Sequence, residues 1–257
     1  MMHYLDAVSD DISFGYKYPQ MSIPFVVHPA NMLSNGLVMW LPKRVEFLST
    51  PQADGYSMPW IKQLIAHEYR HAVQYNNLNR GLIKALSYVI GQQSSTIGLL
   101  FMPLWMMEGD AVMTETAMST FGRGLQPSFS MTYRAIGEGV GLSYKGEKRK
   151  NIDRWFCGSY RDYIPDHYQL GYQMVAYGNE KVGRVMANDM AAYGPRKPWM
   201  IISEDWRMRR LFGFTGHTLF QETFQSLNDF WTKTPLPENS SCMLATPRFM
   251  SYTTYSD

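Results

Sequence analysis

Residues 57–76, SMPWIKQLIAHEYRHAVQYN, contain the pattern His-Glu-x-x-His from His67 to His71. Side chains four positions apart on an α-helix lie on the same face, so the two imidazoles can reach one metal ion. Glu68, next to the first histidine, can then act on a water held at that ion. Ser57 is suited to an N-cap, and the apolar residues that follow recur at helical spacing. The same residues could also form a solvent-exposed helix face that binds no metal. A third ligand elsewhere in the chain would favour the metal site over this alternative.

Length and composition describe a globular chain. Its 257 residues suffice for one large domain or two small ones, with 45% hydrophobic and 18% charged residues. The formal net charge of +2 gives no electrostatic argument for a nucleic-acid partner. Cys157 and Cys242 are too few for a disulfide framework or a cysteine-ligated zinc site. The sequence is compatible with two free thiols and with one bridge between them.

Targeting signals are missing from the sequence as given. No apolar run reaches the roughly 18 residues of a transmembrane helix. Residues 1–11 lack the basic and apolar regions of a secretory signal peptide.

The pattern along the chain predicts an α+β fold. Asn35-Gly36 and Pro42-Lys43 separate apolar runs in residues 21–48, which predicts a small antiparallel N-terminal sheet. A helix is predicted from Met102 to about Ser119, and helical segments run from Asp166 to about Trp231. Residues 120–164 between them are rich in Gly, Ser and basic residues and are assigned no element. We therefore expect one domain over residues 1–232, with a sheet lobe at about 1–50 packed on a helical lobe at about 57–232. Residues 233–257 read as a tail or as a truncated junction to a further module.

The predicted second helix offers the third ligand. Glu108 follows His71 after 36 intervening residues, and Gly109 beside it is expected to allow close approach to the metal helix. Glu115, seven residues further, lies on the same helix face and can orient a ligating imidazole. Asp110 points elsewhere, and we interpret it as a surface residue.

These two motifs resemble those of the gluzincin peptidases, which are zinc enzymes. HEYRH followed by WMMEGDAVMTE is similar to their paired motifs His-Glu-x-x-His and Trp-x-x-Glu-Gly-x-Ala. The resemblance covers roughly residues 20–230 and implies a zincin-type helical domain that binds Zn²⁺. It implies that His67, His71 and Glu108 are the ligands, that Glu68 is the general base, and that Glu115 supports a ligand.

The same resemblance suggests how a substrate is handled. Tyr168 opens a Tyr-x-x-Gly-Tyr segment similar to one whose tyrosine hydroxyl stabilises the oxyanion in gluzincins of the aminopeptidase type. The segment that grips a free amino terminus in those enzymes has no counterpart here, which favours an endopeptidase acting on peptides or proteins. The strand with Val38, Met39 and Trp40 stands where such peptidases place the edge strand that pairs with the substrate backbone.

Within that group, the chain looks most like uncharacterised bacterial envelope members that are often fused to a β-propeller. This implies the cell envelope or periplasm as location and a possible propeller in the full-length protein. The alternative function is a catalytically inactive zincin-fold module that binds a peptide or a glycan, since a protease fold does not guarantee a protease.

Overall fold

The computed structural model describes residues 2–18, 22–29, 32–51, 58–120, 122–139, 156–157, 166–197 and 203–234. This part of the chain is mostly helical with one small sheet, which confirms the predicted α+β class. The strands are β1 (Phe25–His28), β2 (Ser34–Trp40) and β3 (Lys43–Ser49). The α-helices are α1 (Met2–Ile12), α2 (Trp60–Leu78), α3 (Gly81–Ile90), α4 (Ser94–Gly98), α5 (Leu104–Ala117), α6 (Pro127–Gly139), α8 (His167–Val182), α9 (Met186–Tyr193), α10 (Glu204–Phe212) and α11 (Gly216–Lys233). Short 3-10 helices are η1 (Gly91–Gln93), η2 (Leu99–Phe101), η3 (Arg123–Leu125) and η4 (Gly194–Arg196).

The sheet is mixed, so the prediction of an antiparallel sheet is wrong for one strand. Its order is β1-β3-β2, with β2 antiparallel to β3 but β1 parallel to it, Phe25 lying beside Val45. Strand β3 is inserted between two strands that precede it, and an apolar pattern does not reveal which strands become neighbours. Asn35-Gly36, expected to separate two runs, lies inside β2.

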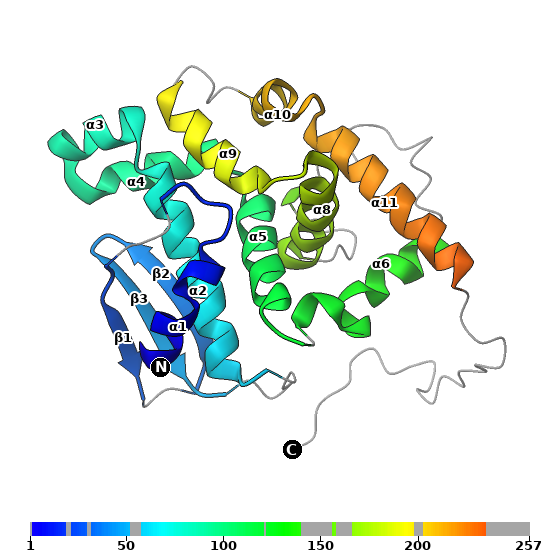
Figure 1. The fold of residues 1–257 in the computed structure, drawn as a ribbon, viewed down its shortest axis with the longest axis horizontal. Coiled ribbons are helices and arrows are strands. Elements are labelled where there is room, and N and C mark those ends of the chain that lie inside the picture. Colours follow the sequence, from blue (N-terminus) through cyan, green and yellow to red (C-terminus); the bar gives the residue numbers. More distant parts are fainter. Residues whose placement is uncertain are drawn as a thin grey trace, which may run out of the picture.

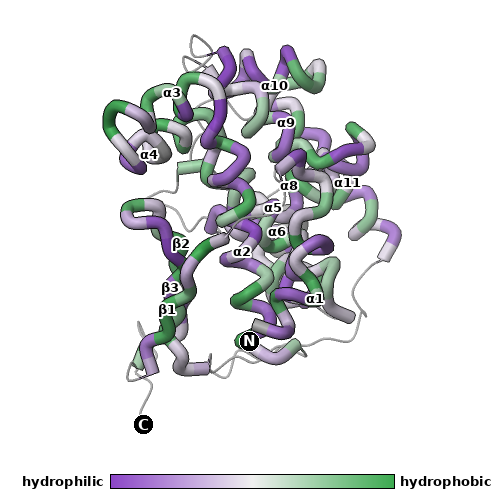
Figure 2. Tube along the Cα trace, turned by 60° about the vertical axis from the view of Figure 1, so that its left-hand side comes forward, coloured by the Kyte–Doolittle hydropathy of each residue, from purple (hydrophilic) through white to green (hydrophobic). Residues whose placement is uncertain are grey.

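Helix α2 occupies the centre of the molecule. Figures 1 and 2 show the sheet on one side of α2, with α5 and then α8 on the other side. The predicted start at Ser57 falls outside the described residues, and the helix begins after Pro59. All five residues of the HEYRH motif are buried, with 3–8% of their surface exposed. The motif is therefore not a solvent-exposed helix face.

The closest helix packing joins α5 to α8. A Cβ atom built on Gly109 would lie 2.2 Å from the backbone carbonyl atoms of Gly171, and one built on Gly171 would lie 1.9 Å from the Trp105 carbonyl oxygen. Gly109 thus permits close approach of α5 to α8. The prediction that it permits close approach to the helix with His67 and His71 is wrong. Both glycines are needed because the two backbones touch where a methyl group would otherwise stand.

Several other segments differ from expectation or lie outside the structure. Helix α6 forms in a region, residues 120–164, to which the sequence assigned no element. Cys157 is an exposed free thiol, while Cys242 and the predicted tail from residue 235 onward are outside the described residues. Among the described residues, no helix is both long enough and apolar enough to cross a lipid bilayer.

The glycine contact predicts a position-specific loss of stability. Gly171→Ala should lower the free energy of unfolding by about 3 kcal/mol, because the added methyl group forces α5 and α8 apart. Gly98→Ala is the matched control: it is also a buried helical glycine, but its nearest neighbour would be 3.4 Å away. That variant should be neutral or slightly stabilising. Urea unfolding measures both, and equal effects of the two substitutions would contradict the packing described.

Candidate metal centre

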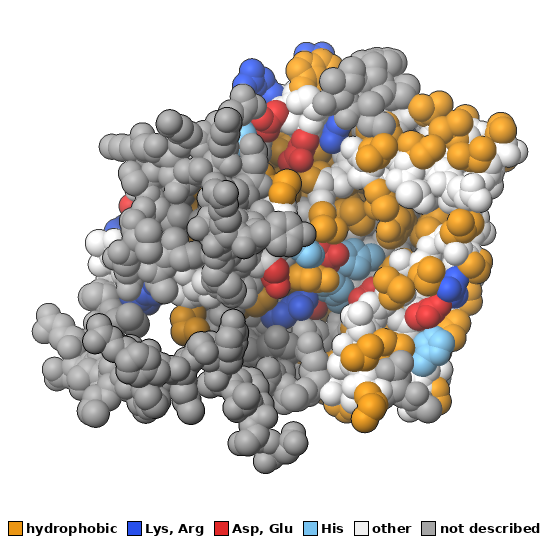
Figure 3. Space-filling view, turned by 180° about the vertical axis from the view of Figure 1, so that it is seen from behind, with side chains coloured by type: hydrophobic (Ala, Val, Ile, Leu, Met, Phe, Trp, Pro, Cys, Tyr) orange, Lys and Arg blue, Asp and Glu red, His pale blue; other side chains and the backbone are white. Residues whose placement is uncertain are grey.

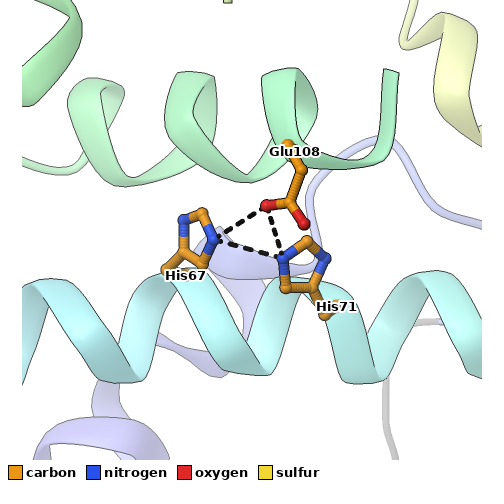
Figure 4. A group of neighbouring side chains, drawn as sticks. All are labelled: His67, His71 and Glu108. Carbon is orange, nitrogen blue, oxygen red and sulfur yellow. Dashed lines mark hydrogen bonds and ion pairs between the residues drawn. The ribbon is translucent and has the colours of Figure 1, made fainter. Parts of the chain in front are cut away.

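Three side chains from two facing helices converge on one point. His67 and His71 project from α2, and Glu108 projects from α5 toward them (Figure 4). The two Nε2 atoms are 3.1 Å apart, and Glu108 Oε2 lies 3.2 Å from His67 Nε2 and 3.1 Å from His71 Nε2. These three residues form a cluster that can hold a metal ion. The helix spacing and the predicted third ligand thus lie where the sequence placed them.

Each histidine has a polar partner behind its ring. Glu115 Oε2 lies 3.2 Å from His67 Nδ1, on the side of the ring away from the cluster. Gln74 Oε1 lies 2.8 Å from His71 Nδ1. When His71 Nδ1 donates its proton to Gln74 Oε1, His71 Nε2 presents its lone pair to the metal position. His67 Nδ1 lies 3.3 Å from Arg123 Nη2 as well as 3.2 Å from Glu115 Oε2. Glu115 was predicted for this role, whereas Gln74 was not; its only signal is its position one helical turn after His71.

The electrostatics of the cluster favour a retained proton. Burial by itself would lower the pKa of both histidines, because it disfavours the imidazolium ion. Hydrogen bonds to Glu108 and Glu115 outweigh burial at His67 and raise its pKa to about 9. The charge of Glu108 raises the pKa of His71 as well. Burial would raise the pKa of Glu108, but the two histidines hold it well below its usual range.

Glu68 is buried beside the cluster and touches the edge strand of the sheet. A Cβ atom built on Gly36 of β2 would lie 2.5 Å from Glu68 Cγ and 2.7 Å from its Oε1. Glycine at this position therefore lets the strand backbone approach the carboxylate. Burial is the main cause that raises the pKa of Glu68, and the nearby histidines oppose it. A carboxylate with a raised pKa in a cleft is suited to accept and return a proton near neutral pH.

A cleft of about 820 Å³ contains these groups. Its lining includes apolar side chains before and at the start of α5, namely Leu99, Met102 and Leu104. It also includes polar residues, among them Gln63, Arg123 and Gln169. Figure 3 shows histidine and acidic side chains in a hollow on this face of the molecule.

Tyr168 lies in the same cleft, at the beginning of α8. Its ring centroid is 5.9 Å from that of His67, so the residue singled out by the resemblance does reach the cluster. Burial, followed by the charge of Glu108, raises the pKa of Tyr168 to about 12, although Arg123 acts in the opposite direction. The hydroxyl therefore remains a hydrogen-bond donor throughout the physiological pH range.

The predicted substrate strand is only partly at the cleft. Val38 lines it together with residues 34–37, but Met39 and Trp40 are not among the lining residues. Trp40 stacks on Tyr75 with ring centroids 5.1 Å apart. Ser34–Val38 of β2 thus border the cleft, and the last two residues of the strand do not.

Asp110 is a buried residue, and its interpretation as a surface residue is wrong. Only 1% of Asp110 is exposed, and its carboxylate accepts hydrogen bonds from Arg70 at 2.8 and 2.7 Å. It also accepts hydrogen bonds from Gln74 at 2.8 Å and from the Tyr16 hydroxyl at 3.0 Å. Spacing along one helix could not reveal these partners, because Arg70 and Gln74 lie on α2 and Tyr16 follows α1.

Arg123, which the sequence did not single out, completes the surroundings of His67. Its Nε donates to Glu115 Oε1 at 2.6 Å, and its guanidinium lies 5.3 Å from the centre of the Tyr168 ring. It enters from η3, outside both motifs, so only the fold brings it to the site. Arg123 links the carboxylate behind His67 to the phenol in the cleft.

The raised pKa of His67 predicts that metal binding displaces a proton. Because this pKa is about 9, the apparent affinity for Zn²⁺ should rise by about tenfold per pH unit from pH 7 to about pH 9. Calorimetric titration of metal-free protein in buffers of different ionisation enthalpy measures the released protons. His28→Ala, at a histidine that pairs with Glu46 in the sheet, should leave affinity and proton count unchanged. Zinc binding without proton release at pH 7.5 would contradict this protonation state.

Comparison with known proteins adds no relative to this picture. No family model, no curated protein and no solved structure matches the chain. The case for the site therefore rests on the two sequence motifs and on the geometry that brings His67, His71 and Glu108 together.

Proposed function

We propose that this chain is a zinc-dependent metallopeptidase of the gluzincin type that hydrolyses internal peptide bonds. The single observation that carries the proposal is the triangle of His67, His71 and Glu108 with the Glu68 carboxylate buried beside it. A catalytically inactive binding module would need no more than the three metal ligands, and would not need Glu68. A buried carboxylate next to an open metal position is the additional group that hydrolysis requires.

The donor set fits Zn²⁺. Zinc binds histidine nitrogen and carboxylate oxygen at about 2.0–2.2 Å, so a tetrahedral site separates its ligand atoms by about 3.3–3.5 Å. The three donor atoms here are 3.1–3.2 Å apart, within a few tenths of an ångström of that spacing. Two imidazoles and one carboxylate leave a fourth position free for chemistry, as in catalytic zinc sites.

In this proposal the protein residues manage the protons of hydrolysis. Zinc supplies a Lewis acid that lowers the pKa of water and polarises a carbonyl group. Glu68 accepts the proton of the attacking water and delivers it to the departing amine. The Tyr168 hydroxyl donates a hydrogen bond to the oxygen on which negative charge develops. Its pKa of about 12 keeps it protonated for that purpose.

The cleft suits an extended polypeptide as substrate. Strand β2 is an edge strand of the sheet and borders the cleft through Ser34–Val38, so its free backbone groups are available to pair with a peptide. Among the uncharged side chains of the cleft, three buried atoms have no hydrogen-bond partner in the described residues: Ser34 Oγ, Gln63 Oε1 and Gln169 Oε1. Buried polar atoms normally find partners, and peptide groups of a bound substrate would provide them.

Glu68→Gln tests the catalytic assignment. The variant should bind zinc with the affinity of the parent but hydrolyse a peptide library at least about 100-fold more slowly, because the amide cannot accept the proton. Glu180→Gln, an exposed glutamate on α8, is the matched control and should keep full activity. Equal turnover of Glu68→Gln and parent would exclude Glu68 as the base. A zinc-loaded parent that binds peptides without cleaving them would instead identify the inactive binding module.

Tyr168→Phe tests the oxyanion role separately. Loss of one donor at an oxyanion site costs about 10²–10³ in kcat, so we expect a loss of that size with KM nearly unchanged. Zinc affinity should stay the same, because the hydroxyl is not one of the three ligand groups. Steady-state kinetics on one cleavable peptide provides the measurement. A kcat within threefold of the parent would remove Tyr168 from the mechanism.

A further inference from the structure

The helical hairpin formed by α3, η1, α4 and η2, residues 81–101, presents apolar side chains that the described residues do not cover. On α3, Tyr88 is 79% and Val89 is 83% exposed, and Ile83 is the buried residue that anchors the helix. Leu100 of η2 is 60% exposed, and Leu104, the first residue of α5 after the hairpin, is 54% exposed. We call this set of exposed side chains the hairpin patch. An exposed apolar area of this kind marks a surface that meets something other than water.

The hairpin patch lies on a projecting corner of the molecule. Figure 1 shows α3 and α4 extending beyond the sheet and the central helices. In Figure 3, seen from behind, the corresponding upper right of the molecule is orange and white without red or blue. The hairpin is helical, so its backbone groups are largely bonded within it and can enter a less polar medium at little cost.

The hairpin itself carries positive charge only. No Asp or Glu occurs between Glu68 and Glu108, and Lys84 is an exposed cation on α3 itself. Arg196 is exposed in η4, an element that packs against α3. Lys43 is on the neighbouring sheet hairpin, where its backbone N–H donates to the Gln92 side chain at 3.0 Å. The patch is thus an apolar surface with basic residues near it and no acidic ones in its own segment.

We propose that the hairpin patch docks this protein onto the surface of an anionic lipid bilayer. Tyr88, Val89 and Leu100 would enter the boundary between headgroups and acyl chains, while Lys84 and Arg196 would pair with lipid phosphates. The charge pattern favours this partner: a lipid surface provides negative groups around an apolar interior, which is the complement of the patch. The serine, threonine, glutamine and glycine residues at the hairpin tip add no further charge to be desolvated.

Docking at this place brings the metal cleft to the membrane. Leu99 of the hairpin, and Met102 and Leu104 directly after it, line the cleft. If the proposed peptidase function holds, its substrates are polypeptides at the bilayer surface. The docking itself rests on the hairpin patch alone and does not depend on zinc or on catalysis.

Vesicle sedimentation of the full chain tests the proposal. Binding is expected to vesicles of phosphatidylcholine containing phosphatidylglycerol, and weaker binding to vesicles of phosphatidylcholine alone. The double variant Tyr88→Ser/Val89→Ser should lower the partition coefficient at least about tenfold, because two apolar side chains no longer leave water. Lys84→Glu should weaken binding to the anionic vesicles and leave the neutral ones unaffected. Phe230→Ser, at a 60% exposed residue of α11, is the matched control and should bind like the parent.

Three outcomes would overturn the proposal. The first is a parent protein that sediments with neither vesicle, and the second is a double variant that binds like the parent. The third is a parent that forms a dimer which the double variant loses while neither binds vesicles, since a second copy would then cover the patch. Glu68→Gln should bind vesicles like the parent, so a failed peptidase assignment leaves this result intact. Circular dichroism of each variant establishes that its helices are retained.

Discussion

The contact between α2 and α5 depends on a carboxylate that has no access to water. Asp110 is buried on α5, and a charge in that position is tolerated only when it is paired and fully hydrogen-bonded. Arg70 and Gln74 of α2 meet this requirement and thereby fix how α5 is rotated against α2. With α5 held in that rotation, Glu108 faces the two histidines of α2. The metal cluster is thus a consequence of a neighbouring ion pair that takes no part in metal binding.

The same ion pair ties the N-terminal segment to the site. Arg70 Nη1 donates to the carbonyl oxygens of Ile12 and Phe14 at 2.6 and 2.9 Å, and the Tyr16 hydroxyl donates to Asp110. Gln74 then connects Asp110 to His71 Nδ1 through its two amide atoms. Four side chains therefore form one buried network from the end of α1 to His71 of the candidate metal cluster. Removal of any one partner leaves a buried polar group unsatisfied, which costs more than the hydrogen bond itself contributes.

The sequence predicted the parts of the site that follow from local periodicity. His67 and His71 are four apart on a helix, and Glu115 lies two turns after Glu108, so their faces could be read from spacing. Asp110, Gln74 and Arg123 escaped because their roles depend on partners from other elements. Gly109 was recognised as a close-contact residue but assigned to the wrong helix, since a glycine indicates that something is near without indicating what. The α+β class could be predicted because it depends on which segments form helices and strands. The parallel pairing of β1 could not, because it depends on the order of the strands in the sheet.

The contact between Gly36 and Glu68 makes the strand and the carboxylate a matched pair. If β2 slipped by a single residue along β3, Asn35 or Leu37 would arrive where only a hydrogen atom fits. The register of the edge strand is thus constrained by the Glu68 side chain, which leaves room only for glycine at this point of the strand. Homologous chains that carry a larger residue at the place of Gly36 should have a shorter acid at position 68, or should lack the chemistry that we propose for Glu68.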